Sequence, residues 1–351
     1  MGSERVDDGS AAAKVLAAAA DGVVDLIARH NGDIDSIFGT AGLEIREIDS
    51  PFNEINLSQY CALFEEAAAR TGNDNFGLSF GQRFEPRRLG AIGRLAVHSP
   101  TMAAAIGNFV RYFPAHQDHS ILTLEDDGGL MWLHYQIIHP RIGRRRQDAE
   151  LSLGMFCNIF WHGLGPGWQP MEIHFEHPRS DGHVEHETCF RAPVRFGQRS
   201  NSIAFCKRDL DAVMPTSDPY LLSVIERFLV ERQALRSEPE DLVGALRARI
   251  RIRLGGKAPT LSEFGKEFGV SARTMQRRLR DCGVSFHDLL RGARRELALS
   301  YVRDTDIALT DVALALGYSE HSAFTRAFRA WTGLSPQRYR SRSRCPHSGA
   351  P

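Results

Sequence analysis

The chain has 351 residues, of which 42 % are hydrophobic and 25 % charged, a balance typical of ordinary folded cores in two domains. The 43 basic and 43 acidic side chains cancel overall, yet residues 242–351 hold 20 Lys and Arg against 9 Asp and Glu. A net charge of +11 on this segment, against −11 on the rest, predicts a C-terminal module that binds phosphate groups.

The six cysteines are scattered along the chain and form no C-x-x-C pair: Cys61, Cys157, Cys189, Cys206, Cys282 and Cys345. This pattern argues against a zinc ribbon, a thioredoxin-like site and a disulfide scaffold, and indicates thiols in a reducing compartment. No stretch approaches the roughly 18 apolar residues needed to span a bilayer. We therefore expect a cytoplasmic protein that has no membrane partner.

Helical spacing of apolar residues predicts four helices near the N-terminus. The first covers residues 12–30, after a disordered segment at 1–10. Asp33 is the expected cap of a short second helix. The third helix is expected at about 58–70, and the fourth is opened by Pro100-Thr101 and ends near residue 113.

The middle of the chain changes to the period of strands. Residues 120–125 and 130–138 predict a hairpin around Asp126-Asp127-Gly128-Gly129. A helix is expected at 147–161, and the further elements are short strands at 171–175, 188–190 and 201–205 and a helix at 219–236. The first 236 residues therefore predict an α+β domain, with 237–241 as the linker to the next one.

The last hundred residues carry one pattern twice, at 261–279 and 310–328. Each copy predicts an amphipathic helix, a tight turn and a second helix that is apolar on one face only. Gly269 and Gly317 suit the turns, where φ is positive, and Ser271 and Ser319 are the expected caps of the second helices. The exposed face of each second helix is polar and basic, which suits insertion into a DNA major groove. The sequence thus predicts a tandem helix-turn-helix.

The residues between the two copies, 285–303, have helical spacing and predict a rod of roughly 25–28 Å at about 1.5 Å per residue. Such a rod can hold two recognition helices about one DNA turn, roughly 34 Å, apart. We expect residues 242–340 to form an all-α domain in which this long helix joins the two motifs, followed by a basic flexible tail at 341–351.

Residues 242–340 resemble the DNA-binding domain of AraC/XylS-family transcription regulators. The resemblance rests on Ile307, Val312-Ala313, Gly317-Tyr318, Phe324, Arg326-Ala327-Phe328, Gly333, Ser335-Pro336 and Tyr339-Arg340. By position it implies a DNA-binding set of Ser271, Arg273, Thr274, Gln276, Arg277, Glu320, His321, Ser322, Thr325 and Arg326. Arg can pair with guanine and Gln with adenine. Arg277 and Arg278 cannot both face the groove, and for Arg326 both a base and a phosphate contact stay open.

The N-terminal part resembles the arabinose-binding-like domain of one AraC/XylS branch, over residues of about 76–220. The matching segments are 90–93, 192–196, 201–205 and 210–211. The resemblance implies a response to a small metabolite, such as an amino acid or an amine, and implies nothing about sugar.

One candidate ligand site combines a strand with the helix that follows it. The residues are Trp132, His134 and Gln136 on one face of the strand, and Phe156, Phe160 and Trp161 on the helix. Two interpretations stay open, an aromatic effector pocket and plain core packing.

Metal and enzyme sites are not indicated. The pairs His116/His119, His174/His177 and His183/His186 have H-x-x-H spacing, which lacks the i,i+4 facing of zinc enzymes. The sequence shows no Ser-His-Asp or G-x-S-x-G arrangement and no Walker or dinucleotide loop. We expect no metal, no cofactor and no enzymatic activity.

These observations predict a bacterial, sequence-specific DNA-binding transcription regulator, an activator that responds to a small metabolite bound by residues 1–236. The expected partners are double-stranded DNA, the effector, RNA polymerase and a second copy of the chain. Two alternatives stay open. The N-terminal domain of an effector-independent regulator would only oligomerise, and an enzyme fused to a DNA-binding domain would use a reactive cysteine.

Overall fold

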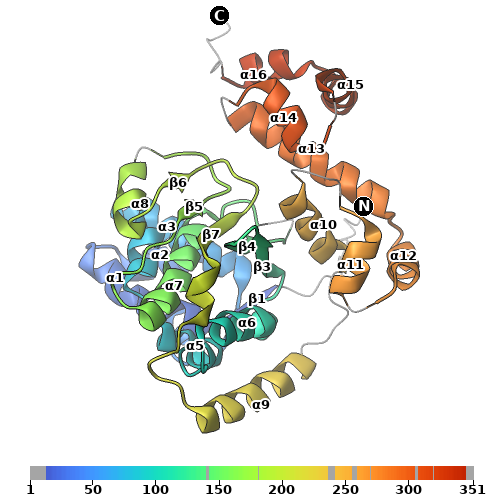
Figure 1. Ribbon diagram of the computed structural model, residues 1–351. Coiled ribbons are helices and arrows are strands. Elements are labelled where there is room, and N and C mark those ends of the chain that lie inside the picture. Colours follow the sequence, from blue (N-terminus) through green and yellow to red (C-terminus); the bar gives the residue numbers. More distant parts are fainter. Residues whose placement is uncertain are drawn as a thin grey trace, which may run out of the picture. The chain divides into compact units, whose positions relative to one another are not determined.

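The structure, a computed structural model, describes residues 13–139, 142–180, 182–235, 242–254, 259–268, 270–304, 307–318 and 320–344. Its elements are drawn in chain order in Figure 1, and the chain divides into two compact units. Unit 1 comprises residues 1–120, 139–167 and 210–236, and unit 2 comprises residues 121–138, 168–209 and 237–351. The expected linker at 237–241 and the expected disordered residues 1–10 lie outside the described residues.

Unit 1 is mainly helical. Its helices are α1 (Val23–Arg29), α2 (Ile34–Ala41), α3 (Leu57–Thr71), α4 (Phe76–Arg83), α5 (Gly90–Val97), α6 (Met102–Tyr112), α7 (Arg146–Leu164) and α9 (Pro219–Leu235). Short 3₁₀ turns are η1 (Ala17–Ala20), η2 (Ile45–Ile48), η3 (Pro86–Leu89) and η4 (Phe113–Ala115). The strands β1 (Lys14–Leu16) and β2 (Glu54–Asn56) form an antiparallel pair.

Several predicted helix boundaries in unit 1 are confirmed by their caps. Asp33 accepts a hydrogen bond from the Ser36 N–H at 3.1 Å and begins α2, and Thr101 accepts one from the Ala104 N–H at 3.2 Å and begins α6. Gly72 follows α3 with a φ of 67°, a conformation that glycine adopts without strain.

The prediction of one helix over residues 12–30 is wrong. Gly22, with a φ of 88°, separates α1 from the strand and 3₁₀ turn before it. Val15 lies opposite Ile55 in the β1–β2 ladder, and the alanines of η1 are buried. Strand pairing satisfies the backbone here, so tertiary contacts override the helical propensity of the alanine-rich run.

The closest helix packing in unit 1 joins α4 to α7 through glycines. A Cβ atom on Gly77 would lie 2.2 Å from the Gln147 carbonyl oxygen, and one on Gly81 would lie 2.3 Å from that of Leu151. The buried Gln147 side chain also accepts a hydrogen bond from the Gly77 N–H at 2.6 Å. The two backbones therefore touch directly, which any side chain at these glycines would prevent.

Unit 2 contains a five-stranded sheet in the order β3-β4-β7-β5-β6. The strands are β3 (Ser120–Asp127), β4 (Leu130–Ile137), β5 (Glu172–His174), β6 (Val194–Arg195) and β7 (Asn201–Cys206), with α8 (His183–Phe190) and the 3₁₀ turn η5 (Lys207–Asp211) beside them in sequence. β7 pairs antiparallel with β4 and β5, whereas β5 and β6 are parallel. The β3–β4 hairpin turns at Gly128 and Gly129, both with positive φ, as predicted.

The predicted strand at 188–190 is wrong, because these residues end α8. Spaced four apart on this helix, His186 and Phe190 are buried and pack on the Phe175 ring, at centroid distances of 5.7 and 6.0 Å. This contact with a residue after β5 is not visible in the local pattern, and it selects the helix.

The C-terminal part of unit 2 is all helical, as predicted. Its helices are α10 (Leu242–Arg253), α11 (Leu261–Glu267), α12 (Ala272–Asp281), α13 (Phe286–Asp304), α14 (Leu309–Ala315), α15 (His321–Thr332) and α16 (Pro336–Arg344). α16 continues into the segment expected to be a flexible tail, and residues 345–351 lie outside the described residues. The fold class, an α+β region followed by an all-α region with two helix-turn-helix motifs, is confirmed.

Candidate nucleic-acid interface

The first helix-turn-helix motif consists of α11 and α12. Thr260 and Glu263 form a capping box, in which each side chain accepts a hydrogen bond from the backbone N–H of the other, at 3.3 and 2.7 Å. The turn closes where the Val270 N–H donates to the Gly265 carbonyl at 2.8 Å. A Cβ on Gly265 would lie 2.8 Å from the Val270 carbonyl oxygen, so the tight turn requires this glycine. The predicted turn residue Gly269 lies outside the described residues.

The second helix of this motif, α12, has its apolar residues on one face and its basic residues on the other. Ser271 is its N-cap, as predicted, and accepts a hydrogen bond from the Thr274 N–H at 3.1 Å. Met275 and Leu279 are buried, whereas the exposed residues are Arg273, Gln276, Arg277, Arg278 and Arg280. Within the described part of the chain, Arg273, Gln276 and Arg277 make no side-chain hydrogen bond or ion pair. Their donors are therefore available to a ligand.

The second helix-turn-helix motif consists of α14 and α15. Gly317 has a φ of 74° in the turn, as predicted, and the Tyr318 N–H donates to the Ala313 carbonyl at 3.0 Å. Glu320 occupies the N-cap position of α15, one residue after the predicted cap Ser319, and its carbonyl accepts hydrogen bonds from the helix. Ser319 itself lies outside the described residues.

On α15 the predicted DNA-binding residues are largely exposed and partly bonded to each other. His321 Nδ1 lies 3.3 Å from the Leu309 carbonyl oxygen, and His321 Nε2 lies 3.3 Å from the Thr325 hydroxyl. The Ser322 hydroxyl donates to the Glu320 carboxylate at 3.0 Å. Arg326 is exposed, and within the described residues it makes no side-chain hydrogen bond or ion pair.

One continuous hydrophobic core joins the two helix-turn-helix motifs. Buried residues of α12 and α15 belong to the same cluster as those of α10 and α13: Leu246, Ile250, Met275, Leu279, Leu289, Ala293, Leu297, Phe324 and Phe328. Figure 1 shows α12 and α15 near opposite ends of α13. At about 1.5 Å per residue, the 19 residues of α13 span roughly 28 Å. The two exposed helices, α12 and α15, therefore share one hydrophobic core with the same long helix, α13.

Hydrogen bonds from two arginines hold the second helix-turn-helix motif against α13. Arg294 donates to the Leu316 carbonyl at 3.1 Å, and its guanidinium lies 5.3 Å from the centre of the Tyr318 ring. Arg340 of α16 donates to the Val302 and Ile307 carbonyls, at 3.0 and 2.8 Å. These arginines serve the fold, and they show that a basic residue in this region is not by itself a DNA contact.

Three of the predicted ligand-binding residues lie together on β4 in unit 2. The Trp132 ring is stacked with that of His134, with centroids 6.1 Å apart, and lies 4.7 Å from the ring of His174. His134 Nδ1 lies 2.8 Å from the Ser200 hydroxyl. Gln136 is buried and donates to the Arg199 carbonyl at 2.8 Å.

The other three predicted ligand-binding residues lie on α7 in unit 1. Phe156 is buried and makes edge-on contacts with Phe109 and Phe113, at centroid distances of 5.2 and 6.0 Å. Phe160 is also fully buried, and Trp161 is half-buried. For Phe156 this is the packing of a hydrophobic core, the second of the two interpretations left open by the sequence.

Both histidines next to Trp132 favour their neutral forms. Burial, together with the charge of His174, lowers the pKa of His134 to about 4. Burial also lowers the pKa of His174, against the opposing effect of Glu172. At pH 7 these two side chains therefore act as neutral hydrogen-bonding groups.

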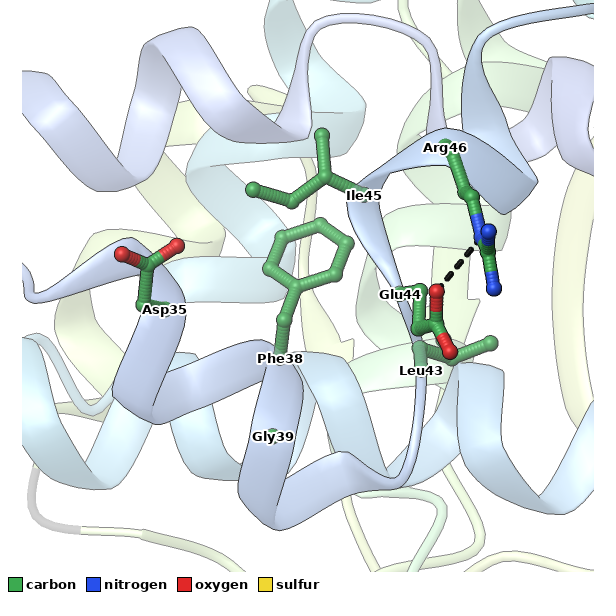
Figure 2. Close-up of a pocket in the computed structure, with 7 residues that line it drawn as sticks. All are labelled: Asp35, Phe38, Gly39, Leu43, Glu44, Ile45 and Arg46. Carbon is green, nitrogen blue, oxygen red and sulfur yellow. Dashed lines mark ion pairs between the residues drawn. The ribbon is translucent and has the colours of Figure 1, made fainter.

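A hollow of about 370 Å³ lies elsewhere, on the surface of unit 1 (Figure 2). Its lining comes from α2 and the segment that follows: Asp35, Phe38, Gly39, Leu43, Glu44, Ile45 and Arg46. The Glu44–Arg46 ion pair at its rim is largely exposed to solvent. None of the residues predicted from the sequence to bind a ligand lines this hollow.

The structure also connects residues that the sequence did not single out. Arg199, between β6 and β7, donates to the Tyr301 hydroxyl of α13 at 3.1 Å and to the Ala315 carbonyl of α14 at 3.2 Å. Glu125 of β3 accepts from Arg253 of α10 at 3.2 Å. No sequence period marks these pairs, since their members are about one hundred residues or more apart.

Two further features concern the described residues only. They contain no group of three or more His, Cys, Asp and Glu side chains arranged to hold a metal ion. None of their helices has the length and apolar character needed to cross a bilayer.

Comparison with known proteins gives matches over both parts of the chain. Residues 32–214 match the family described as the arabinose-binding domain of AraC transcription regulators, N-terminal, and residues 264–342 match a helix-turn-helix domain. The chain is 26 % identical over 326 residues to the ornithine utilization regulator of Pseudomonas aeruginosa, covering 93 % of this chain and 96 % of that one. It is also 26 % identical to the transcriptional regulator VirS of Mycobacterium tuberculosis, over 82 % of this chain and 84 % of that one.

Among solved structures, the transcriptional regulator CdpR of Pseudomonas aeruginosa matches 90 % of this chain and 98 % of its own. The sequence identity is 18 % and the TM-score is 0.39.

Proposed function

The chain belongs to the AraC family of transcription regulators, within the group that carries an arabinose-binding-like N-terminal domain, and from this premise we propose that it activates transcription in response to a small metabolite. It is a DNA-binding transcription regulator. We further propose which residues contact DNA, to which chemical class the effector belongs and that the chain forms a homodimer. We assign effector binding and dimerisation to residues 1–236 and DNA binding to residues 242–340.

The observation that carries the DNA-reading part is the pair of second helices, α12 and α15, exposed on one shared core. Arg273, Gln276 and Arg277 of α12 keep their donors free within the described residues, and Arg326 does so on α15. A bidentate arginine contact to guanine is the commonest specific contact in the major groove, and glutamine can pair with adenine in the same bidentate way. We assign Gln276 and Arg277 to bases, and His321, Ser322, Thr325 and Arg326 to the second groove.

Effector response is supported by the N-terminal domain match and by the relatives. One relative is named for ornithine utilization, and we propose that this chain likewise responds to an amino acid, an amine or a related catabolite. The relatives and the matched domains are those of regulators, so we propose a regulatory role without catalysis. Because its target is DNA, we place its action in the bacterial cytoplasm, with RNA polymerase as a partner in activation.

A homodimer is supported by the exposed face of α9. Tyr220, Val224 and Phe228 follow one another at intervals of four residues, with 81, 50 and 40 % of their surfaces exposed, while Leu229 on the other side is fully buried. An apolar stripe on a single helix can meet its own copy about a two-fold axis. A chain that sediments as a monomer at the concentrations that protect two DNA half-sites contradicts this part.

The DNA-reading assignment is tested with the operator recovered by in vitro selection on the full-length protein. In the Gln276→Ala/Arg277→Ala double variant, the free energy of specific operator binding should weaken by several kcal/mol at most. Each good bidentate contact is worth about 1–3 kcal/mol. Arg278→Ala, which removes one neighbouring positive charge, should instead weaken binding to operator and unrelated DNA equally. Unchanged operator affinity of the double variant contradicts the assignment of α12.

A further inference from the structure

The two faces of the five-stranded sheet differ, because a buried apolar row on one face lies next to a polar row on the other. Leu133, Ile203 and Ile173 lie side by side across β4, β7 and β5 and are fully buried. The next row, His134, Ser202 and His174, projects from the opposite face, because side chains alternate along each strand. A sheet covered only by core residues would carry apolar side chains on both faces.

Ser202, at the centre of this polar row, has an unused hydrogen-bonding group. Its side chain is fully buried between two histidines, and its hydroxyl has no hydrogen-bond partner among the described residues. A buried hydroxyl without a partner costs about 1–3 kcal/mol. Such a group is satisfied when a ligand enters the row.

Next to Ser202, the Glu172 carboxylate and one ring nitrogen of His174 are hydrogen-bond acceptors. His174 Nε2 lies 3.0 Å from the Glu172 carboxylate and therefore carries the proton, which leaves Nδ1 of the neutral ring as an acceptor. The carboxylate of Glu125 lies 3.8 Å from His134 Nε2 on the other side. Glu172 and Glu125 keep 26 and 30 % of their side-chain surfaces exposed, so the two carboxylates beside the row are in contact with solvent.

An acceptor-rich row beside an indole ring matches one ligand chemistry. A primary ammonium group has three N–H donors and no acceptor, and it is attracted to the face of a tryptophan ring. We propose that Ser202 and His174 of this row, together with Trp132 and Glu172, bind the ammonium group of a small organic amine. This site rests on the effector response proposed above and names its ligand class.

Contacts within unit 2 connect this row to both helix-turn-helix motifs. Gln136, on the same face of β4, donates to the carbonyl of Arg199, whose guanidinium bonds α13 and α14. Glu125, beside His134, accepts from Arg253, whose guanidinium lies 5.1 Å from the centre of the Phe264 ring of α11. An amine that competes for Glu125 or moves Gln136 thus acts on the helices that read DNA.

The test uses the full-length protein labelled with ¹⁵N-tryptophan, whose four indole signals are recorded by NMR, with the Trp132 signal assigned through Trp132→Phe. The probe is 1,4-diaminobutane, and butane-1,4-diol is its uncharged counterpart. We expect the amine to shift the Trp132 signal saturably and the diol to leave it unchanged. No saturable shift of the Trp132 signal, or an equal shift by the diol, overturns the proposal.

Ser202→Ala tests the row directly. Because the wild-type hydroxyl is buried without a partner, the variant should fold with unchanged or higher stability, while amine affinity falls about tenfold. Ser152→Ala, at another buried serine on α7, is the matched control and should bind the amine like wild type. Equal amine affinity in wild type and Ser202→Ala overturns the site. Operator binding by the amine-free protein is measured in parallel, and its absence contradicts the proposed function independently of the amine site.

Discussion

Single side chains on the two recognition helices differ in how far they are already engaged. Arg277 on α12 is exposed and makes no hydrogen bond or ion pair within the described chain, whereas His321 on α15 is tethered to the Leu309 carbonyl and to Thr325. A tethered side chain loses less conformational entropy when it binds, and a free arginine adapts to more base geometries. If these side chains contact DNA as proposed, the first helix-turn-helix motif is the more adaptable of the two and the second the more preorganised.

His134 makes the stability of the protein depend on pH. Its pKa is about 4 in the folded protein and 6.5 in the unfolded chain, so between these values the unfolded state binds more protons. Stability is therefore greatest above pH 6.5 and falls as the pH drops towards 4. We expect this one group to cost about 2 kcal/mol between pH 7 and pH 5.

Urea unfolding at the two pH values measures this effect in wild type and in His134→Asn. The variant should lose about 2 kcal/mol less than wild type on acidification, because it has no imidazole to protonate. His287→Asn, at an exposed histidine on α13, is the control and should behave like wild type. The same pH dependence in His134→Asn and wild type would falsify the assignment.

At the level of elements, the α4–α7 contact depends on backbone shape. Gly77 and Gly81 are one helical turn apart on α4 and face the carbonyls of Gln147 and Leu151. Gly154 of α7 completes the contact, since a Cβ there would lie 2.8 Å from the carbonyl carbon of Gly81. This packing holds α7 at a distance that no other residue type permits.

Gly81→Ala should therefore destabilise the protein by about 1–3 kcal/mol or more, because the new methyl group would overlap a backbone carbonyl that cannot move away freely. Gly107→Ala, on α6, is the matched control, as its Cβ would meet nothing within 4 Å. There we expect a gain of roughly 0.5–1 kcal/mol from helix propensity. Thermal unfolding followed by circular dichroism measures both, and equal stability of the two variants contradicts this account.

The elements also differ in how well their sequences predict them. α12 and α15 have strong one-sided periodicity, so their positions and buried residues follow from the pattern. The local sequence at 12–30, predicted as a helix, and at 188–190, predicted as a strand, does not decide between helix and strand. Their partners, β2 for Val15 and Phe175 for Phe190, lie elsewhere in the chain and decide between the alternatives.

At the scale of the whole molecule, unit 2 unites the sheet with the DNA-binding helices. Arg199 contributes two hydrogen bonds to α13 and α14, and Glu125 accepts one from α10. Phe268, at the end of α11, also packs against Ile121 of β3. Communication between effector and DNA requires two sites that bias a common element, and we propose that these contacts form that element.

Arg199→Ala should loosen α14. Loss of two charge-assisted hydrogen bonds, worth about 1.5–3 kcal/mol each at most, should accelerate amide hydrogen exchange in α14 by about tenfold or more. Arg208→Ala removes an exposed arginine of η5 and should leave exchange in α14 unchanged. Hydrogen exchange followed by mass spectrometry measures both variants. Wild-type protection of α14 in Arg199→Ala contradicts a role for this contact.

The two helix-turn-helix motifs follow from the amino-acid sequence alone. Periodicity, caps and turn glycines placed two helix-turn-helix motifs and their exposed arginines, because these signals act within about twenty residues and need no distant partner. The surroundings of Trp132, in contrast, depend on long-range contacts that exist in the folded protein alone. Strand register brings His134, Ser202 and His174 into one row and the packing of unit 2 brings Arg199 to α14, whereas Phe156 is drawn into the core of unit 1. Such contacts join residues far apart in the chain, and their energy depends on the folded arrangement, which local propensity does not encode.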